Sequence, residues 1–178
     1  MKTLFSIVLF AFIFSVVGKS QNTYNLPLDP NTNKVLYKEV VDEPAPKDTL
    51  FTRAFMWVKA TFPNFSSAIS KKDPENGILE CNMRVKLTTT DKKGIIVSGG
   101  AISYTLRIEM KENKYRIIAT DFKRVDVSLP IESWFKDENA EAIALHQQHF
   151  TQVENEVKKS FESVKQGLKA KVIIKDEW

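Results

Sequence analysis

Two histidines lie three residues apart in the segment His146-Gln147-Gln148-His149, and they are the side chains best suited to metal or acid–base chemistry. On a helix, residues at i and i+3 are neighbours, so two imidazoles at this spacing can reach one metal ion. A closed site needs more ligands, and the chain contains only 2 histidines. We therefore predict no metal site, and we interpret His146 as partly buried and His149 as a surface residue.

The sequence lacks the other common catalytic patterns. Cys81 is the single cysteine, so it can form neither an internal disulfide nor a zinc cluster, and its place in an alternating apolar set predicts a buried, inert thiol. No serine lies in a nucleophile-elbow pattern, and Gly94, Gly99 and Gly100 do not form a phosphate loop. We predict a protein that is not an enzyme and uses no cofactor.

A third group of residues suggests binding. In three segments that predict strands, 79–87, 102–111 and 114–127, apolar residues alternate with polar ones, so one face is expected in the core and the other outside. Six residues of the outer face are candidate ligand-binding residues: Arg84, Lys86, Arg107, Arg116, Ile118 and Phe122. Arginines beside apolar side chains on an open sheet can receive an acidic ligand, a peptide or a second protein. An ordinary solvated sheet face is the alternative interpretation.

The helix expected after Pro46 carries many aromatic residues. Projected at about 100° per residue, its apolar side chains cover one broad arc. They are Leu50, Phe51, Ala54, Phe55, Trp57, Val58 and Phe62. A stripe this wide suits a helix that lies flat on a sheet, so we predict that its aromatic rings form core rather than a ligand groove.

The order of the elements predicts the fold class. A strand from Val35 to about Asp42 precedes the aromatic helix, a hairpin turning at 73–77 follows, and a tight turn at Glu112-Asn113 joins the last two strands. The last strand loses its alternation at 123–125, where we expect a bulge or an exit from the sheet.

A loop over 128–139 should cap one end of the core, and a long amphipathic helix follows from about Ala140 to Leu168. The order is β-α-β-β-β-β-α, which predicts an α+β fold with an antiparallel sheet and two helices on one face.

The N-terminus predicts export. Lys2 precedes an apolar run from Leu4 to Val17, which is too short to span a bilayer well and is followed by small residues. We expect residues 1–20 to be a cleaved signal peptide, with a membrane anchor as the alternative. The mature protein would then be periplasmic or extracellular, with no membrane span.

The rest of the chain is expected to hold a single domain. Residues 21–34 are rich in asparagine and proline, which predicts a flexible lead-in, and residues 35–178 are long enough for one α+β domain. The net charge is +4, and Lys2 and Lys19 of the predicted signal peptide contribute to it. So small a charge on an exported chain excludes nucleic acid as the expected partner.

Two segments carry a resemblance to a known family: Tyr37–Val41 (YKEVV) and Lys47–Phe62 (KDTLFTRAFMWVKATF). They resemble the opening of an exported family, known mainly from Bacteroidota and described as a domain of unknown function with a TBP-like fold. The matching positions are Glu39, Val40, Val41, Lys47, Leu50, Phe51, Arg53, Ala54 and Trp57. Phe51 stands where the family more often has tyrosine. The resemblance covers roughly residues 35–130, implies a TBP-like fold and supplies no catalytic residue.

These observations lead to two main functional hypotheses, beside a third in which His146 and His149 serve a metal-dependent hydrolase that would co-purify with its metal. The first is an exported, non-enzymatic domain that binds an envelope protein or an acidic ligand through the open sheet face, or that self-associates into a homo-oligomer. The alternative is a carrier of an apolar small molecule held between the helices and the sheet. The likeness to TATA-box binding is one of topology, and topology does not transfer function.

Overall fold

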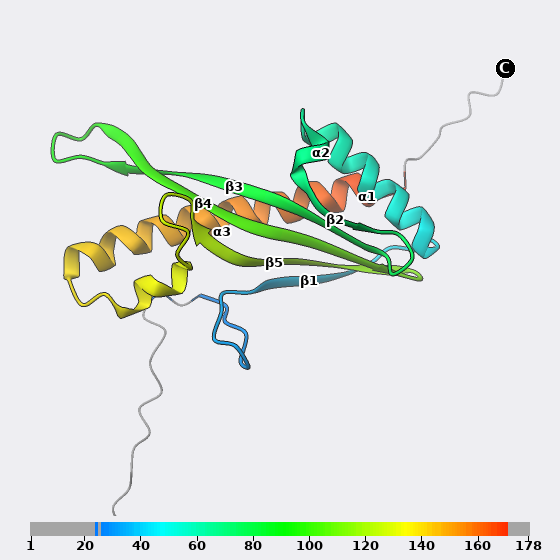
Figure 1. The fold of residues 1–178 in the computed structure, drawn as a ribbon, viewed down its shortest axis with the longest axis horizontal. Coiled ribbons are helices and arrows are strands. Elements are labelled where there is room, and N and C mark those ends of the chain that lie inside the picture. The colour runs from blue at the N-terminus through cyan, green and yellow to red at the C-terminus, as the bar shows by residue number, and fades with distance from the viewer. Residues whose placement is uncertain (1–23, 25, 171–178) are drawn as a thin grey trace, which may run out of the picture.

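The computed structural model describes residue 24 and residues 26–170, and the predicted signal peptide at 1–20 lies outside them. The helices and strands follow the predicted order, which confirms the α+β fold class (Figure 1). They are β1 (Tyr37–Asp42), α1 (Lys47–Thr61), α2 (Phe65–Ala68), β2 (Ile69–Asp73), β3 (Ile78–Thr90), β4 (Ile96–Lys111), β5 (Lys114–Arg124), the 3-10 helix η1 (Ile131–Lys136) and α3 (Ala140–Leu168). Two short elements, α2 and η1, are additional to the prediction.

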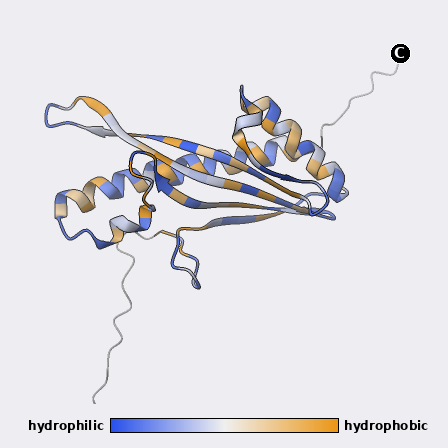
Figure 2. Ribbon diagram, viewed as in Figure 1, coloured by the Kyte–Doolittle hydropathy of each residue, from blue (hydrophilic) through white to orange (hydrophobic). Residues whose placement is uncertain are grey.

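The five strands form one antiparallel sheet in the order β1-β5-β4-β3-β2. Helix α3 crosses behind the strands in Figure 1, and α1 contacts α3, β3 and β4. Along the strands apolar and polar residues alternate (Figure 2), because successive side chains point to opposite sides of the sheet. The apolar set forms the inner face and is buried against the two helices, as Leu79, Leu106 and Ile117 show.

Local signals explain where the helices begin. Helix α1 starts after Pro46, whose φ of −56° suits a helix start, and Asp48 lies in the first turn near the positive end of the helix dipole. Helix α3 starts after Asn139, whose side chain accepts hydrogen bonds from the backbone N–H groups of Glu141 and Ala142. The Asn139 cap satisfies two N–H groups that have no partner within the helix.

The two helices approach each other closely at one glycine. A Cβ atom at Gly167 of α3 would lie 2.5 Å from Cδ1 of Trp57, so only glycine leaves room for this indole. The indole N–H donates to Ser163 Oγ at 3.0 Å. Leu50, Phe51, Ala54, Trp57 and Val58 are buried. Most of the apolar stripe of α1 is therefore core, as predicted, whereas Phe55 lies outside the core cluster and contacts Phe65 and Lys72.

The expectation of a flexible lead-in over 21–34 is wrong for its described residues. Tyr24 and Leu26 are buried in the core, and the Tyr24 hydroxyl donates to the carbonyl of Trp134 at 3.2 Å. A bridge between Leu28 and Val35 then folds the chain back before β1. Burial of Tyr24 and Leu26 and the bridge to Val35 together place this segment on the domain.

A β-bulge in β5 corrects the predicted position of Phe122. Thr120 pairs with Thr105 and Lys123 pairs with Ser103, so Asp121 and Phe122 together oppose Tyr104. Asp121 takes a φ of 55°, a left-handed conformation that aspartate tolerates better than most residues. The break in the alternation thus lies at Asp121, two residues earlier than expected. Because of this extra residue, the Phe122 ring points to the inner face of the sheet.

Beyond the sheet, β3 and β4 continue as a two-stranded extension, which we call the β3–β4 arm and define as residues 88–98. It projects at one end of the molecule in Figure 1 and carries exposed Ile95, Ile96 and Val97. The arm is joined to α3 through Gln152, whose side-chain amide donates to the Thr88 carbonyl at 2.7 Å. The register shifts at Gly99, where the arm meets the sheet.

Candidate functional site

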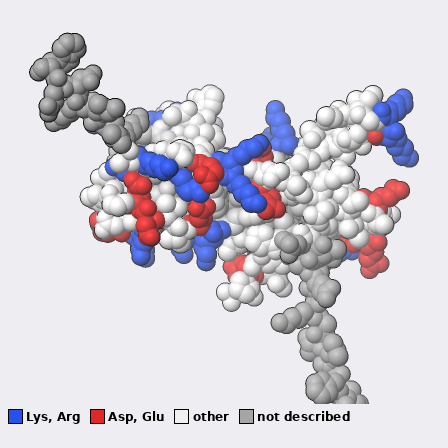
Figure 3. Space-filling model, turned by 180° about the vertical axis from the view of Figure 1, so that it is seen from behind, with Lys and Arg blue, Asp and Glu red and all other residues white. Residues whose placement is uncertain are grey.

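The candidate site is the outer face of the sheet, formed by the residues that alternate with the buried set. Among the described residues, the helices cover only the inner face. The basic members of the outer face are Lys38, Lys71, Arg84, Lys86, Arg107, Lys111, Lys114, Arg116 and Lys123, and the acidic ones are Asp42, Asp73, Glu80 and Glu109. Basic residues thus predominate. The opposite side, shown in Figure 3, instead mixes acidic and basic side chains closely.

Two of the predicted arginines are neutralised by acidic neighbours. Arg107 lies between two carboxylates, with Nε 2.7 Å from Glu109 and Nη1 3.2 Å from Glu80. Arg116 forms an ion pair with the same Glu109, which is its cross-strand partner as predicted. All of these groups are less than half exposed, so the pairs screen the central charge of the face. Arg107 and Arg116 therefore hold the strands together more than they offer charge to a partner.

Arg84 and Lys86 are different, because both are exposed and neither has an ion-pair partner within the described residues. Arg84 borders two shallow hollows, of about 400 Å³ and about 360 Å³, which also share Val125. Lys86 lines the smaller one, together with Asp126, whose carboxylate is paired with Arg124. Lys123 also lines the larger hollow. A cationic rim around an apolar floor is the arrangement that receives an acidic, partly apolar segment.

The two apolar candidates, Ile118 and Phe122, lie on opposite sides of the sheet. Ile118 lies on the outer face, where it is opposite Lys38 and Arg107. Phe122 is only 1% exposed and stacks on Tyr104 with ring centroids 5.1 Å apart, so its prediction as a surface ligand contact is wrong.

Sequence reasoning missed Lys123 and Val125 as members of the hollow. The bulge at Asp121 brings Lys123 onto the outer face. An aspartate in the middle of a strand segment was the available signal, since aspartate is depleted in strands.

The prediction of a partly buried His146 is confirmed, and the prediction of a surface His149 is wrong. His149 is 4% exposed and thus the more buried of the pair, whereas His146 is half-buried and stacks on Trp134 with centroids 4.3 Å apart. Within the described residues no cluster of three or more potential metal ligands exists. Cys81 is buried as predicted, and burial raises the pKa of its thiol to about 12.

The histidines predict a pH-dependent stability. Burial lowers the pKa of His149 below its ordinary value of 6.5, and nearby His146 adds to the effect. Burial also lowers the pKa of His146, against the opposing effect of Asp137. Because the unfolded chain takes up the proton first, the free energy of unfolding should be constant above pH 6.5 and fall as the pH drops below it.

Urea unfolding from pH 8 to about pH 5 measures this dependence, since most carboxylates remain ionised in that range. The matched variant His149→Gln should show a flatter profile. An equally steep profile in the variant would assign the effect to other groups.

The arrangement of one antiparallel sheet with helices on one face defines an α+β protein of the TBP-like class. Residues 37–124 match the family described as domain of unknown function (DUF4468) with TBP-like fold, and this part of the chain belongs to that family. The resemblance proposed from β1 and α1 is therefore confirmed. No curated protein matches the chain significantly.

Two solved structures share the fold. A DUF4468 family protein from Bacteroides ovatus superposes with a TM-score of 0.63 at 13% identity, over 82% of this chain and 91% of that one. A TBP-like protein from Parabacteroides distasonis gives a TM-score of 0.52 at 18% identity, over 78% of this chain and 96% of that one. At sequence identities this low, the structural likeness establishes a shared fold and nothing about function. Among the described residues, no helix has both the length and the apolar character that crossing a bilayer requires.

Proposed function

We propose that the protein is an exported, non-enzymatic binding module that holds an acidic segment of a partner protein on its outer sheet face. The observation that carries this proposal is the pair Arg84 and Lys86, which are exposed, lack ion-pair partners within the described residues and border a hollow of about 360 Å³. Charges that are not used within the fold remain available to a partner.

The distribution of charge supports an acidic partner. The predominance of basic residues is confined to the outer face, although the whole chain carries a net charge of only +4. A face of one sign accelerates association with a partner of the opposite sign, and salt weakens this effect beyond about 10 Å. The remainder of the surface lacks that bias, so binding should be directional.

The carrier hypothesis has less support. A carrier of apolar molecules needs an interlayer cavity of ligand size, and the described side chains between helices and sheet contact one another instead. Trp57 contacts Gly167 directly, and Leu50, Ile108 and Ile117 are fully buried in the same core cluster. Opening this layer for a guest would expose core residues.

Charge reversal at the hollow is the test of this proposal. The double variant Arg84→Glu, Lys86→Glu should bind a fluorescent glutamate-rich peptide about tenfold more weakly than the native chain, because two exposed charges contribute about 1–2 kcal/mol together. Fluorescence anisotropy at low and at physiological salt measures the affinity. A thermal melt confirms that the variant folds.

The matched control is Lys158→Glu, Lys159→Glu on α3, where both side chains are well exposed. It changes the net charge by the same amount on the helical side and should bind the peptide nearly as well as the native chain. Equal losses in both variants, or no loss in either, would contradict the proposal. Sedimentation of the native chain shows whether the outer face instead joins two copies.

A further inference from the structure

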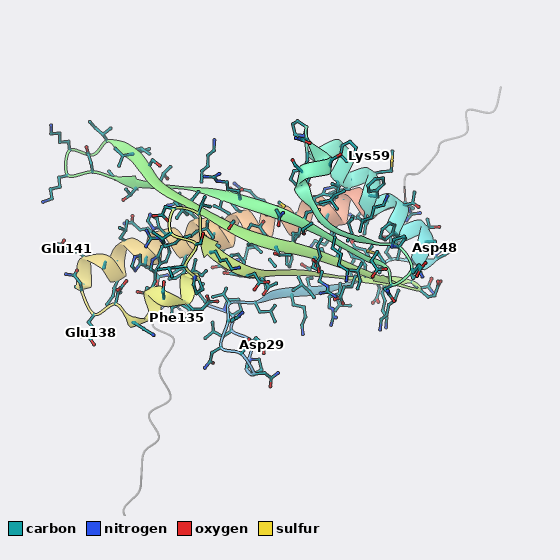
Figure 4. All side chains as sticks on the ribbon, in the orientation of Figure 1. Asp29, Asp48, Lys59, Phe135, Glu138 and Glu141 are labelled. Atoms are coloured by element: carbon teal, nitrogen blue, oxygen red, sulfur yellow. The ribbon has the colours of Figure 1, made fainter. Side chains whose placement is uncertain are left out.

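A small pocket lies where the arm meets the sheet, and we call it the end pocket. Its volume is about 190 Å³, and its walls come from the base of the arm, the chain after β5, η1 and α3. Figure 4 shows Phe135, Glu138 and Glu141 around the corner between η1 and α3 at this end of the molecule. The residues that matter for its chemistry are Arg124, Asp126, Trp134, His146 and His149.

His149 places two buried nitrogen atoms with unsatisfied hydrogen-bonding capacity at the pocket. His149 is only 4% exposed, and neither ring nitrogen has a hydrogen-bond partner within the described residues. A neutral imidazole carries one donor and one acceptor, and each buried group left unpaired costs about 1–3 kcal/mol. A Cβ atom at residue 99 would lie 2.7 Å from Nε2 of His149, so Gly99 is what admits the ring to this position.

The surrounding charges select the sign of a ligand. Three basic side chains line the pocket, namely Arg124, His146 and His149. Arg124 donates to Asp126 through Nε at 3.2 Å and through Nη2 at 2.6 Å, which leaves its Nη1 group without a hydrogen-bond partner among the described residues. His146 Nδ1 lies 3.1 Å from Asp137, which engages that imidazole on the side of η1 and leaves His149 without a carboxylate.

The apolar walls select the type of anion. Leu87 and Ile102 from the base of the arm, Leu145 from α3 and the Trp134 indole line the same space. A strongly hydrated anion such as phosphate would lose its water against these groups, whereas a carboxylate with a short carbon chain brings an apolar end of its own.

We propose that the end pocket binds a small monocarboxylate, whose oxygens accept hydrogen bonds from His149 and from the Arg124 guanidinium and whose carbon chain contacts Leu87, Ile102 and Trp134. The end pocket shares Arg124 with the larger hollow of the outer face and Asp126 with the smaller one, but His149 and Trp134 line the end pocket alone, and the proposal does not depend on the proposed function. It gives buried His149 the partner that the protein itself does not provide.

Binding of the anion should take up a proton. His149 faces His146 on its own helix, Arg124 and Asp126 on the chain after β5, and the uncharged base of the arm, while Asp137 engages His146. Asp126 is paired with Arg124 and Asp137 lies against His146, so burial and nearby His146 keep the pKa of His149 below its ordinary value and the ring neutral at pH 7. A bound carboxylate favours its protonated form. The affinity should therefore rise as the pH falls from 7.5 to 5.5.

The test is an NMR titration of the full exported chain with propionate, acetate and inorganic phosphate, which follows the ring protons of His146 and His149 and the indole of Trp134. Propionate should give saturable shifts on these residues and raise the pKa of His149, with tighter binding at pH 5.5 than at pH 7.5. Phosphate should not compete. Saturable binding of phosphate alone, or no saturable shift with any probe, would overturn the proposal.

Variants locate the site. His149→Gln and Arg124→Gln should each weaken propionate binding by about tenfold, since each removes one charge-assisted hydrogen bond. Lys123→Gln, the adjacent change on the outer face, should leave it unaltered. If Arg124→Gln folds and binds propionate as tightly as the native chain, the assignment is wrong. The peptide binding of the outer face should not change in His149→Gln, because His149 lines the end pocket and neither hollow of the outer face, and this separates the result from the test of the proposed function.

Discussion

Replacing Phe122 with alanine is expected to lower the free energy of unfolding by about 3–5 kcal/mol. The ring is 1% exposed, stacks on Tyr104 and meets Tyr37 edge-on at 5.8 Å. Its removal leaves a cavity that the sheet cannot close, because the bulge at Asp121 fixes the backbone on that side. Aromatic pairs of this geometry add about 0.5–1.5 kcal/mol beyond the buried area. Urea unfolding monitored by circular dichroism measures the loss.

The matched control is Ile118→Ala, four residues earlier in the same strand and on the outer face. Because Ile118 is only half-buried there, its truncation should cost about 1 kcal/mol or less. An uninterrupted alternation would place Ile118 and Phe122 on one face, and the two variants would then lose similar stability. Similar losses would contradict the bulge, whereas a large difference supports it.

The second large effect is expected at Gly167, where alanine should destabilise the protein by about 1–3 kcal/mol. The added Cβ would lie 2.5 Å from Cδ1 and 2.8 Å from Cβ of Trp57, so the two helices must separate or the indole must move. Moving the indole also strains its hydrogen bond to Ser163. The expected sign is informative, because glycine to alanine within a helix normally stabilises by about 1 kcal/mol.

A thermal melt or urea titration of Gly167→Ala tests this result, with Gln166→Ala as the exposed neighbouring control that should change stability by less than about 0.5 kcal/mol. Combination with Trp57→Leu should reduce the cost of the alanine, since the smaller side chain removes the overlap. If Gly167→Ala is more stable than the native chain, α1 and α3 do not approach at this point.

The outer face and the end pocket differ in what they require of the fold. The outer face needs only that the helices cover one side of the sheet, which the alternation in β3, β4 and β5 already implies. The end pocket needs residues from distant parts of the chain to meet, with His149 of α3 placed against Gly99 of β4. The first was therefore predictable as a candidate site, and the second was not.

Local periodicity determined most of the secondary structure from the sequence. The apolar repeat predicted the long helix with the bounds that it has, Ala140–Leu168. The two-residue turn at Glu112-Asn113 set the register that pairs Glu109 with Arg116. These features depend on neighbours within a few residues, so sequence patterns carry them completely.

Only the tertiary structure decided the features that depend on distant contacts. The composition of residues 21–34 suggested a flexible segment. Tyr24 is nevertheless held on the domain by a hydrogen bond to the carbonyl of Trp134, which is 110 residues away in the sequence. Phe122 turns inward because one residue in a left-handed conformation shifts the phase of β5, and His149 is buried because the base of the arm closes over it. In each case the gain in burial comes from a partner that is remote in sequence, and alternation or helical spacing carries no information about such a partner.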